Sequence, residues 1–119
     1  MKAPVWIVPH THWDREWYLG FQDFRWKLVH ALDAVIDTLG SDASFPHFML
    51  DGQTVLLDDY LALRPERRAR LQTLIAAGRI SIGPWFVQPD DILVTAEALV
   101  RNLQQGRASA RPFPGQGIL

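Results

Sequence analysis

The sequence predicts an α/β fold in which helices flank a parallel sheet. Three short apolar runs alternate with longer runs whose apolar residues recur at helical spacing. This alternation predicts strand–helix–strand units with right-handed crossovers. A chain of 119 residues, of which 48% are hydrophobic, can bury one modest core.

The three expected strands are short and apolar. Residues 4–9 form the first, residues 47–52 lead through the second into a turn, and residues 79–83 form the third. Strands buried in a parallel sheet have such continuous apolar runs. So small a sheet leaves one edge unpaired, and association through this open edge, including with a second copy of the chain, is an alternative role for the protein.

Helices are expected between these strands. The first covers residues 24–39 and ends at Gly40, because a glycine after the last apolar position favours a helix stop. Trp26 belongs to this helix, and we expect it to lie in the core. Residues 54–63 form a second, shorter helix.

Two more helices are expected in the second half of the chain. The helix over residues 65–78 has Pro65 in its first turn, where proline fits best. The last helix covers residues 95–106, with Gly106 at its end. The tail, residues 107–119, is rich in proline and glycine and is expected to be irregular.

Charge and composition exclude several classes of protein. The formal net charge is −1 and the basic residues are scattered, so no surface for nucleic acid is expected. No apolar run is long enough to span a membrane, and we expect a cytoplasmic protein without a membrane partner. The chain has no cysteine, so histidine and carboxylate side chains are the candidate metal ligands.

Polar side chains follow each expected strand. In parallel α/β folds the reactive groups gather at the carboxyl ends of the strands. The residues at these ends are His10, His12, Asp14 and Trp17 after the first strand, Asp51 and Gln53 after the second, and Trp85, Gln88, Asp90 and Asp91 after the third. The sequence therefore predicts one site at one edge of the sheet.

The first of these clusters predicts a metal site. Alternate side chains of an extended chain point the same way, so His12 and Asp14 share a face. An imidazole and a carboxylate suit Zn²⁺, and a catalytic zinc keeps one position open for substrate. His10 is expected to orient the loop rather than to bind the ion. Loop and capping hydrogen bonds are the plainer alternative for these side chains.

The remaining candidates suit a sugar pocket. The face of Trp17 can stack on the C–H face of a sugar ring, although packing is the alternative for any single aromatic residue. Asp51 precedes a glycine turn, and Asp90 or Asp91 is placed to cap the following helix. For these three aspartates, turn chemistry and binding of substrate hydroxyls both stay open.

Three blocks of the sequence, in order, resemble one family. "HTHWDREW" closely resembles the His-x-His-x-Asp-x-x-Trp signature of the family thirty-eight α-mannosidases, the zinc-dependent retaining glycoside hydrolases. "FMLDGQTVLLDDYLALRPE" and "GRISIGPWFVQPDDILVTAEALVRNLQQG" look like the next two blocks of the bacterial branch. The resemblance covers residues 3–111.

This resemblance implies an architecture and a site. Residues 1–106 would be the N-terminal βαβ units of the α-mannosidase catalytic domain, part of a (β/α) barrel of the seven-stranded type. Carried over by position, His12 and Asp14 match the first two zinc ligands. Trp17 matches a tryptophan that contacts the sugar. The implied substrate is a terminal α-mannoside.

The match stops before the family's catalytic carboxylates. The nucleophile, the acid and two further zinc ligands follow the last block in the family and match nothing here. Residues 107–119 are therefore expected to hold a truncation point, and the chain to be an N-terminal fragment that is inactive alone. A metal-dependent polysaccharide deacetylase is a second enzyme alternative, but it expects paired aspartates after the first strand and a His-x-x-x-His, and the chain has neither.

Overall fold

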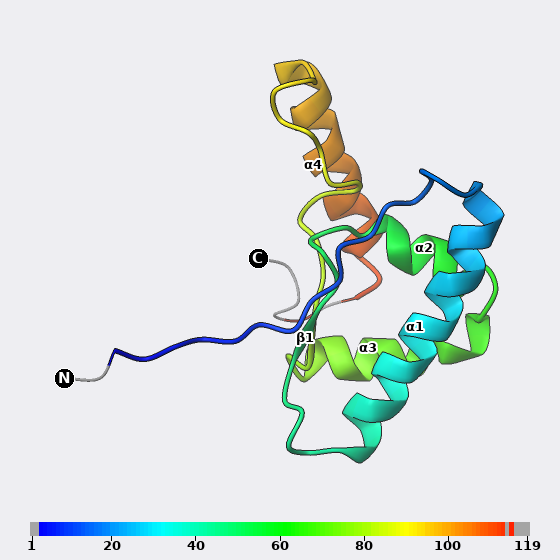
Figure 1. The fold of residues 1–119 in the computed structure, drawn as a ribbon, viewed down its shortest axis with the longest axis vertical. Helices are drawn as coiled ribbons and strands as arrows, with labels where there is room; N and C mark the ends of the chain where they lie inside the picture. Colours follow the sequence, from blue (N-terminus) through cyan, green and yellow to red (C-terminus); the bar gives the residue numbers. More distant parts are fainter. Residues whose placement is uncertain (1–2, 114, 116–119) are drawn as a thin grey trace.

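A computed structural model of the chain describes residues 3–113 and 115. Figure 1 shows helices packed beside a small sheet, while the last helix of the chain projects from this body. The elements in chain order are α1 (Phe21–Ser41), β1 (Phe48–Met49), α2 (Val55–Leu61), a 3₁₀ helix (Pro65–Arg67), α3 (Arg68–Ala76), β2 (Ile80–Ser81) and α4 (Ala96–Ala110). Their order matches the predicted α/β alternation from the first helix onward.

The sheet is smaller than predicted. β1 and β2 run parallel, as expected. Residues 4–9 form no strand, and the N-terminal segment joins the sheet only where His10 bridges Met49 in parallel. The Met49 N–H donates to the carbonyl of Pro9 at 3.0 Å. The segment therefore pairs with β1 but adds a single rung.

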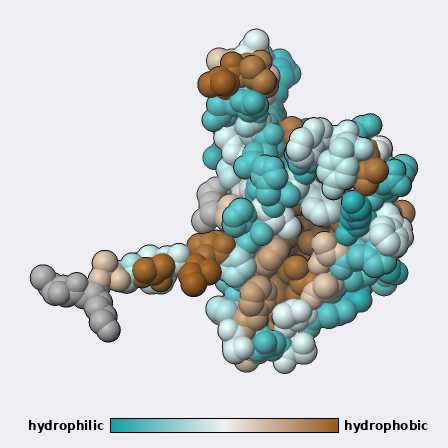
Figure 2. Space-filling view, in the orientation of Figure 1, coloured by the Kyte–Doolittle hydropathy of each residue, from teal (hydrophilic) through white to brown (hydrophobic). Residues whose placement is uncertain are grey.

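The prediction of a buried first strand is wrong for the chain as described. Val5, Trp6 and Ile7 are 85–87% exposed. Figure 2 shows apolar surface along this segment, which extends away from the body. A parallel strand is stable when elements cover both of its faces. These residues have the composition of a buried strand, but no other described part of the chain covers them.

The core lies between the sheet and helices α1, α2 and α3. Helix α1 contributes one apolar stripe because its buried residues recur every three or four positions. The largest fully buried aliphatic side chains are Leu28, Leu32, Ile36, Leu50, Leu56, Leu57, Leu71, Ile75, Ile80 and Ile82. Seven of these residues lie on α1, α2 and α3, and the helices predicted there are confirmed, with ends shifted by up to three residues.

Trp26 is not a core residue, contrary to expectation. It is 63% exposed and its ring packs on His30, with the ring centroids 4.1 Å apart. Two helical positions rotate a side chain by about 200°, so Trp26 lies opposite the buried Leu28. Because Trp26 is apolar and lies within an apolar run, its composition alone did not show that it lies on the exposed face of the helix.

Helix α4 does not end at Gly106, as we expected, but continues to Ala110. Residues 107–110 of the expected irregular tail are therefore helical, and residues 114 and 116–119 lie outside the described part. Gly106 is buried because the loop that begins at Pro84 crosses the helix there. A Cβ at this position would overlap the carbonyl of Pro84 and the backbone of Trp85. The glycine permits a close approach of two backbones rather than a helix stop.

A buried tyrosine joins α2 to α1. Tyr60 is fully buried, and its hydroxyl donates to Asp33 Oδ1 at 2.6 Å. Arg64 and Arg67 form ion pairs with the same carboxylate at 3.1 and 3.5 Å. Burial, together with the hydrogen bond to Asp33, raises the pKa of the Tyr60 hydroxyl well above its ordinary value.

We expect Gly106→Ala to destabilise the protein by about 1–3 kcal/mol, because the added methyl overlaps the crossing loop. Gly40→Ala is the matched control in α1, where only the flexible end of Arg70 is close. It should be neutral or stabilise by up to about 1 kcal/mol, the usual gain in a helix. Urea unfolding followed by circular dichroism measures both. A Gly106→Ala variant as stable as the control would contradict the close-approach explanation.

The buried hydroxyl predicts a loss of stability at alkaline pH. The unfolded tyrosine releases its proton near pH ~10 while the folded one keeps it, so the free energy of unfolding falls as pH rises above about 10. Tyr60→Phe should cost about 1 kcal/mol at neutral pH, because Asp33 loses a donor, and should flatten the alkaline fall. Urea titrations from neutral pH to about pH 11 test this, with Tyr18→Phe, at an exposed phenol, as control. An unchanged slope in Tyr60→Phe would refute it.

Candidate functional site

The loops that follow His10, β1 and β2 meet at one end of the sheet. An open cleft of about 540 Å³ lies there. Asp14 and Arg15 line it from the first loop, Gln53 from the second and Gln88 from the third. The structure therefore places side chains from all three loops around one cavity, as a parallel sheet dictates.

His12 and Asp14 lie next to each other at this edge. The distance from His12 Nε2 to Asp14 Oδ2 is 3.9 Å, and the side chains are 76% and 41% exposed. Two ligands of one tetrahedral zinc lie about 3.4 Å apart, so a small rotamer change lets both reach one ion. Among residues 3–113 and 115, no three His, Cys, Asp or Glu side chains converge on one point. The residues therefore fit half of a zinc site.

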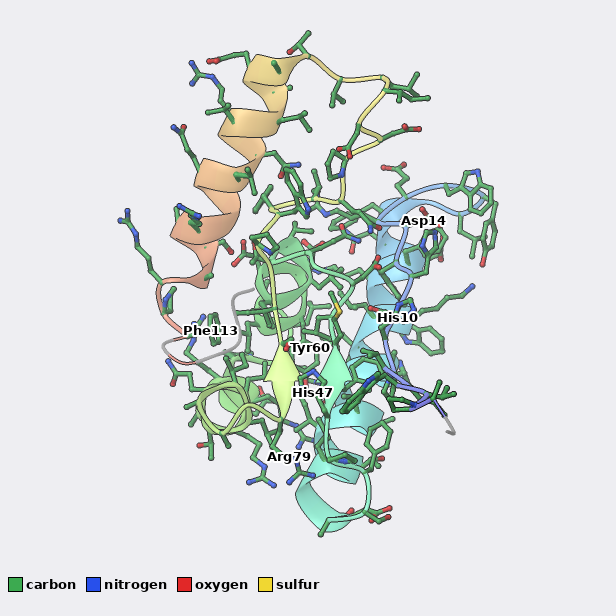
Figure 3. All side chains as sticks on the ribbon, turned by 90° about the vertical axis from the view of Figure 1, so that its left-hand side faces the viewer. His10, Asp14, His47, Tyr60, Arg79 and Phe113 are labelled. Atoms are coloured by element: carbon green, nitrogen blue, oxygen red, sulfur yellow. The ribbon has the colours of Figure 1, made fainter. Side chains whose placement is uncertain are left out.

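His10 does not join this pair in a cluster of three possible metal ligands. Figure 3 shows His10 and Asp14 at separate points of the N-terminal segment, with Asp14 beside the first turns of α1. The exposed His10 ring places Nδ1 2.6 Å from the carbonyl of Thr11, and its backbone forms the bridge to Met49. His10 thus holds the segment to the sheet and is not part of the pair.

Asp51 is buried beneath the loop that carries the pair. It is 6% exposed, and its φ of 44° lies in the left-handed region. Oδ2 accepts the N–H of Trp13 at 2.8 Å and the amide of Gln53 at 2.9 Å. The Oδ2 atom of this carboxylate therefore has both of its hydrogen-bond partners within the protein.

Gln53 is expected at this edge from its place after the second strand, and the structure shows that its side chain contacts all three loops. Its Nε2 donates to the carbonyl of Trp13 at 2.9 Å, and its Oε1 accepts the N–H of Gln88 at 3.2 Å. The side chain is 4% exposed. The signal in the sequence was a long polar residue between an apolar strand and an apolar helix, where burial demands partners.

Arg15 acts outside the predicted set. Its Nε and Nη2 donate to the two carboxylate oxygens of Asp59 at 2.6 and 2.8 Å, and its guanidinium lies 4.5 Å from the ring centroid of Phe21. The hydrogen bonds to Asp59 raise the pKa of the Arg15 guanidinium. This bidentate pair fastens the loop to α2. A lone aspartate among the buried residues of α2 was the signal for it.

The other predicted site residues lie apart from the pair. Trp17 is 75% exposed and packs edge-on against Tyr18, with centroids 5.6 Å apart. Asp90 and Asp91 are exposed and do not line the cleft described above. Neither caps the next helix: Thr95 does, its Oγ1 accepting an N–H at 3.2 Å. The capping alternative for the two aspartates is therefore wrong.

None of the helices in the described part of the chain combines the length and the apolar character needed to cross a bilayer.

Residues 2–111 match the glycosyl hydrolases family 38 N-terminal domain. The chain belongs to this family. Membership follows from the extent of the match, which takes in all the helices, both strands and the His12–Asp14 pair. It confirms the resemblance found in the sequence, and it is at odds with the deacetylase alternative.

Relatives of this family 38 domain are much longer proteins. A "Putative mannosylglycerate hydrolase" from Halalkalibacterium halodurans is 42% identical over 113 residues, which are 95% of this chain and 13% of that protein. An "Alpha-mannosidase 2" from Arabidopsis thaliana is 25% identical over 107 residues, 88% of this chain and 9% of that protein. The chain therefore spans only 9–13% of the length of these relatives.

Solved structures share the fold of this family 38 domain. An alpha-mannosidase from Enterococcus faecalis V583 superposes with a TM-score of 0.86 at 40% identity, over 91% of this chain and 12% of that chain. A family 38 protein from Enterococcus faecalis gives 0.81 at 36% identity over the same shares. The α/β arrangement is thus shown for this chain, while the seven-stranded barrel stays a prediction.

We expect Arg15→Lys to destabilise the domain by about 1–3 kcal/mol, because lysine cannot reproduce the two-pronged contact and Asp59 is only 9% exposed at its side chain. Arg101→Lys is the matched control, since its pair with Glu97 is exposed on both sides. That change should cost less than about 0.5 kcal/mol. Equal effects of the two substitutions in urea unfolding would show that the Arg15 pair does not fasten the loop.

Proposed function

We propose that this chain forms the N-terminal part of the catalytic domain of a zinc-dependent, retaining α-mannosidase. The observation that carries the proposal is the His12–Asp14 pair, 3.9 Å apart at the sheet edge of a family 38 domain. Two relatives, named as an alpha-mannosidase and a putative mannosylglycerate hydrolase, support a mannoside as substrate.

His12 and Asp14 supply an imidazole nitrogen and a carboxylate oxygen to the ion, two of the donors that a catalytic zinc requires. A zinc ion held there by His12 and Asp14 would supply Lewis-acid stabilisation of the oxocarbenium-like transition state of glycoside hydrolysis. Trp17 offers an open indole face to the sugar because three quarters of it is exposed. His10 keeps the segment on the sheet through its bridge to Met49.

Retention of configuration requires two carboxyl groups, one as nucleophile and one as acid and then base. We assign both to parts of the complete enzyme other than these residues, since no motif position matched here supplies them. Asp90 and Asp91 stay predicted contacts to substrate hydroxyls. Asp51, which is buried under the loop, is the weakest of the predicted substrate contacts.

Zinc binding should depend on the pair. We expect the wild-type chain to retain zinc weakly, and His12→Ala and Asp14→Ala each to lose it, because one remaining donor cannot hold the ion. His30→Ala, at an exposed histidine on α1, is the control and should bind as the wild type does. Equilibrium dialysis with zinc analysis measures this. If the wild type and both variants retain equal amounts of zinc, His12 and Asp14 are not its ligands.

The mannosidase activity is testable in a chimera. Residues 3–111 of this chain would replace the matching segment of the Enterococcus faecalis alpha-mannosidase, which is 40% identical. Hydrolysis of an aryl α-mannoside should survive in the chimera. His12→Ala in the chimera should lower kcat/KM by more than the roughly 10- to 100-fold typical of outer metal-site residues. A folded chimera that is inactive, or one indifferent to His12, would contradict the proposal.

A further inference from the structure

Both backbone polar groups of Trp13 are bound by buried side chains. The N–H of Trp13 donates to Asp51 Oδ2 at 2.8 Å, and its carbonyl accepts from Gln53 Nε2 at 2.9 Å. Asp51 and Gln53 are also bonded to each other at 2.9 Å. The three residues therefore form a closed ring of hydrogen bonds.

Trp13 lies between the two predicted ligands. Its N–H belongs to the peptide that joins it to His12, and its carbonyl belongs to the peptide that joins it to Asp14. Fixing these two groups fixes the peptide planes from which both ligand residues leave. The side chains of His12 and Asp14 are themselves 76% and 41% exposed and receive little packing. Their common direction thus depends on the backbone between them.

The turn that carries Asp51, beneath Trp13, has an unfavourable backbone conformation. Asp51 and Gly52 both have positive φ, 44° and 67°. A non-glycine residue in this region costs free energy, and such strain persists where the surroundings impose it. Here the N–H of Trp85 donates to the Gly52 carbonyl at 3.1 Å and holds the turn. The turn places the side chains of Asp51 and Gln53 against the same neighbour.

The ring also reaches the third loop. Gln53 Oε1 accepts the N–H of Gln88, which lines the same cleft as Asp14. One buried amide therefore joins the loops that follow His10, β1 and β2. Losing any of these hydrogen bonds would destabilise the protein, because a buried amide or carboxylate has no water molecule to replace its lost partner.

We propose that Asp51 and Gln53 are positioning residues that clamp Trp13, so that His12 and Asp14 point to one metal ion. Asp51 then acts through the backbone of the loop and is not a substrate contact. The inference rests on the proposed function, because it assumes that His12 and Asp14 bind the metal. A merely structural role would hold the fold without changing metal affinity, and this difference can be measured.

The test uses Gln53→Glu and Gln53→Met in the 119-residue chain. Glutamate cannot donate to the Trp13 carbonyl and repels Asp51, while methionine removes the hydrogen bonds at similar size without adding charge. The Trp13 N–H keeps Asp51 as its acceptor in these variants, but the loop loses the Gln53 bond to the Trp13 carbonyl, and Asp51 loses the Gln53 bond that orients it. We therefore expect the Trp13 amide to exchange with solvent about tenfold faster in the zinc-free variants, which corresponds to about 1.4 kcal/mol. The zinc dissociation constant should rise about 10- to 100-fold. Cobalt absorption should lose intensity in parallel.

Gln104→Glu and Gln104→Met, at an exposed position of α4, are the matched controls and should leave both readouts unchanged. Exchange of amides in α1 reports whether a variant still folds; if Gln53→Glu does not, Gln53→Met decides. Unchanged exchange at Trp13, or faster exchange with unchanged zinc affinity, overturns the clamp. Failure of the proposed function is recognised separately, as zinc binding indifferent to His12→Ala and Asp14→Ala.

Discussion

The parallel pairing of β1 with β2 is the constraint on which the site depends. Because the two strands run the same way, the loops that follow them open on the same edge of the sheet. The pairing continues past the strands, where the Thr54 N–H donates to the Trp85 carbonyl at 2.9 Å. This extension brings Gln53 within reach of Gln88, and the bridge from His10 to Met49 brings the first loop to the same place.

Two buried contacts then hold the first loop from different sides. The Asp51–Gln53 pair fixes the backbone of Trp13, while the bidentate contact with Asp59 fixes Arg15 on α2. The second contact has an electrostatic consequence. Since Asp59 compensates the charge of Arg15, the carboxylates of Asp14 and Glu16 dominate the charge lining the cleft. A cleft of that sign favours a cation over an anionic group.

The sequence pattern predicted the features that depend on residues close together in the chain. Periodicity predicted the helices, because an amphipathic stripe needs only one apolar neighbour. Alternation after an apolar run placed His12 and Asp14 side by side, and the structure has them 3.9 Å apart, while their role as zinc ligands stays a prediction. The end of α4 was missed because the role of Gly106 depends on a loop some twenty residues earlier in the chain. The contacts of Arg15 and Gln53 were missed for the same reason, because their partners are distant in the sequence and the sequence alone does not pair them.

The exposed apolar segment at residues 5–7 and the two-donor metal pair are related features of the proposed enzyme. The apolar side chains of residues 5–7, which are 85–87% exposed, stabilise the fold only when another element covers them. Likewise, two donors bind zinc tightly only when further ligands complete the site. Both needs arise on the N-terminal segment, since His12 and Asp14 follow directly on the apolar run.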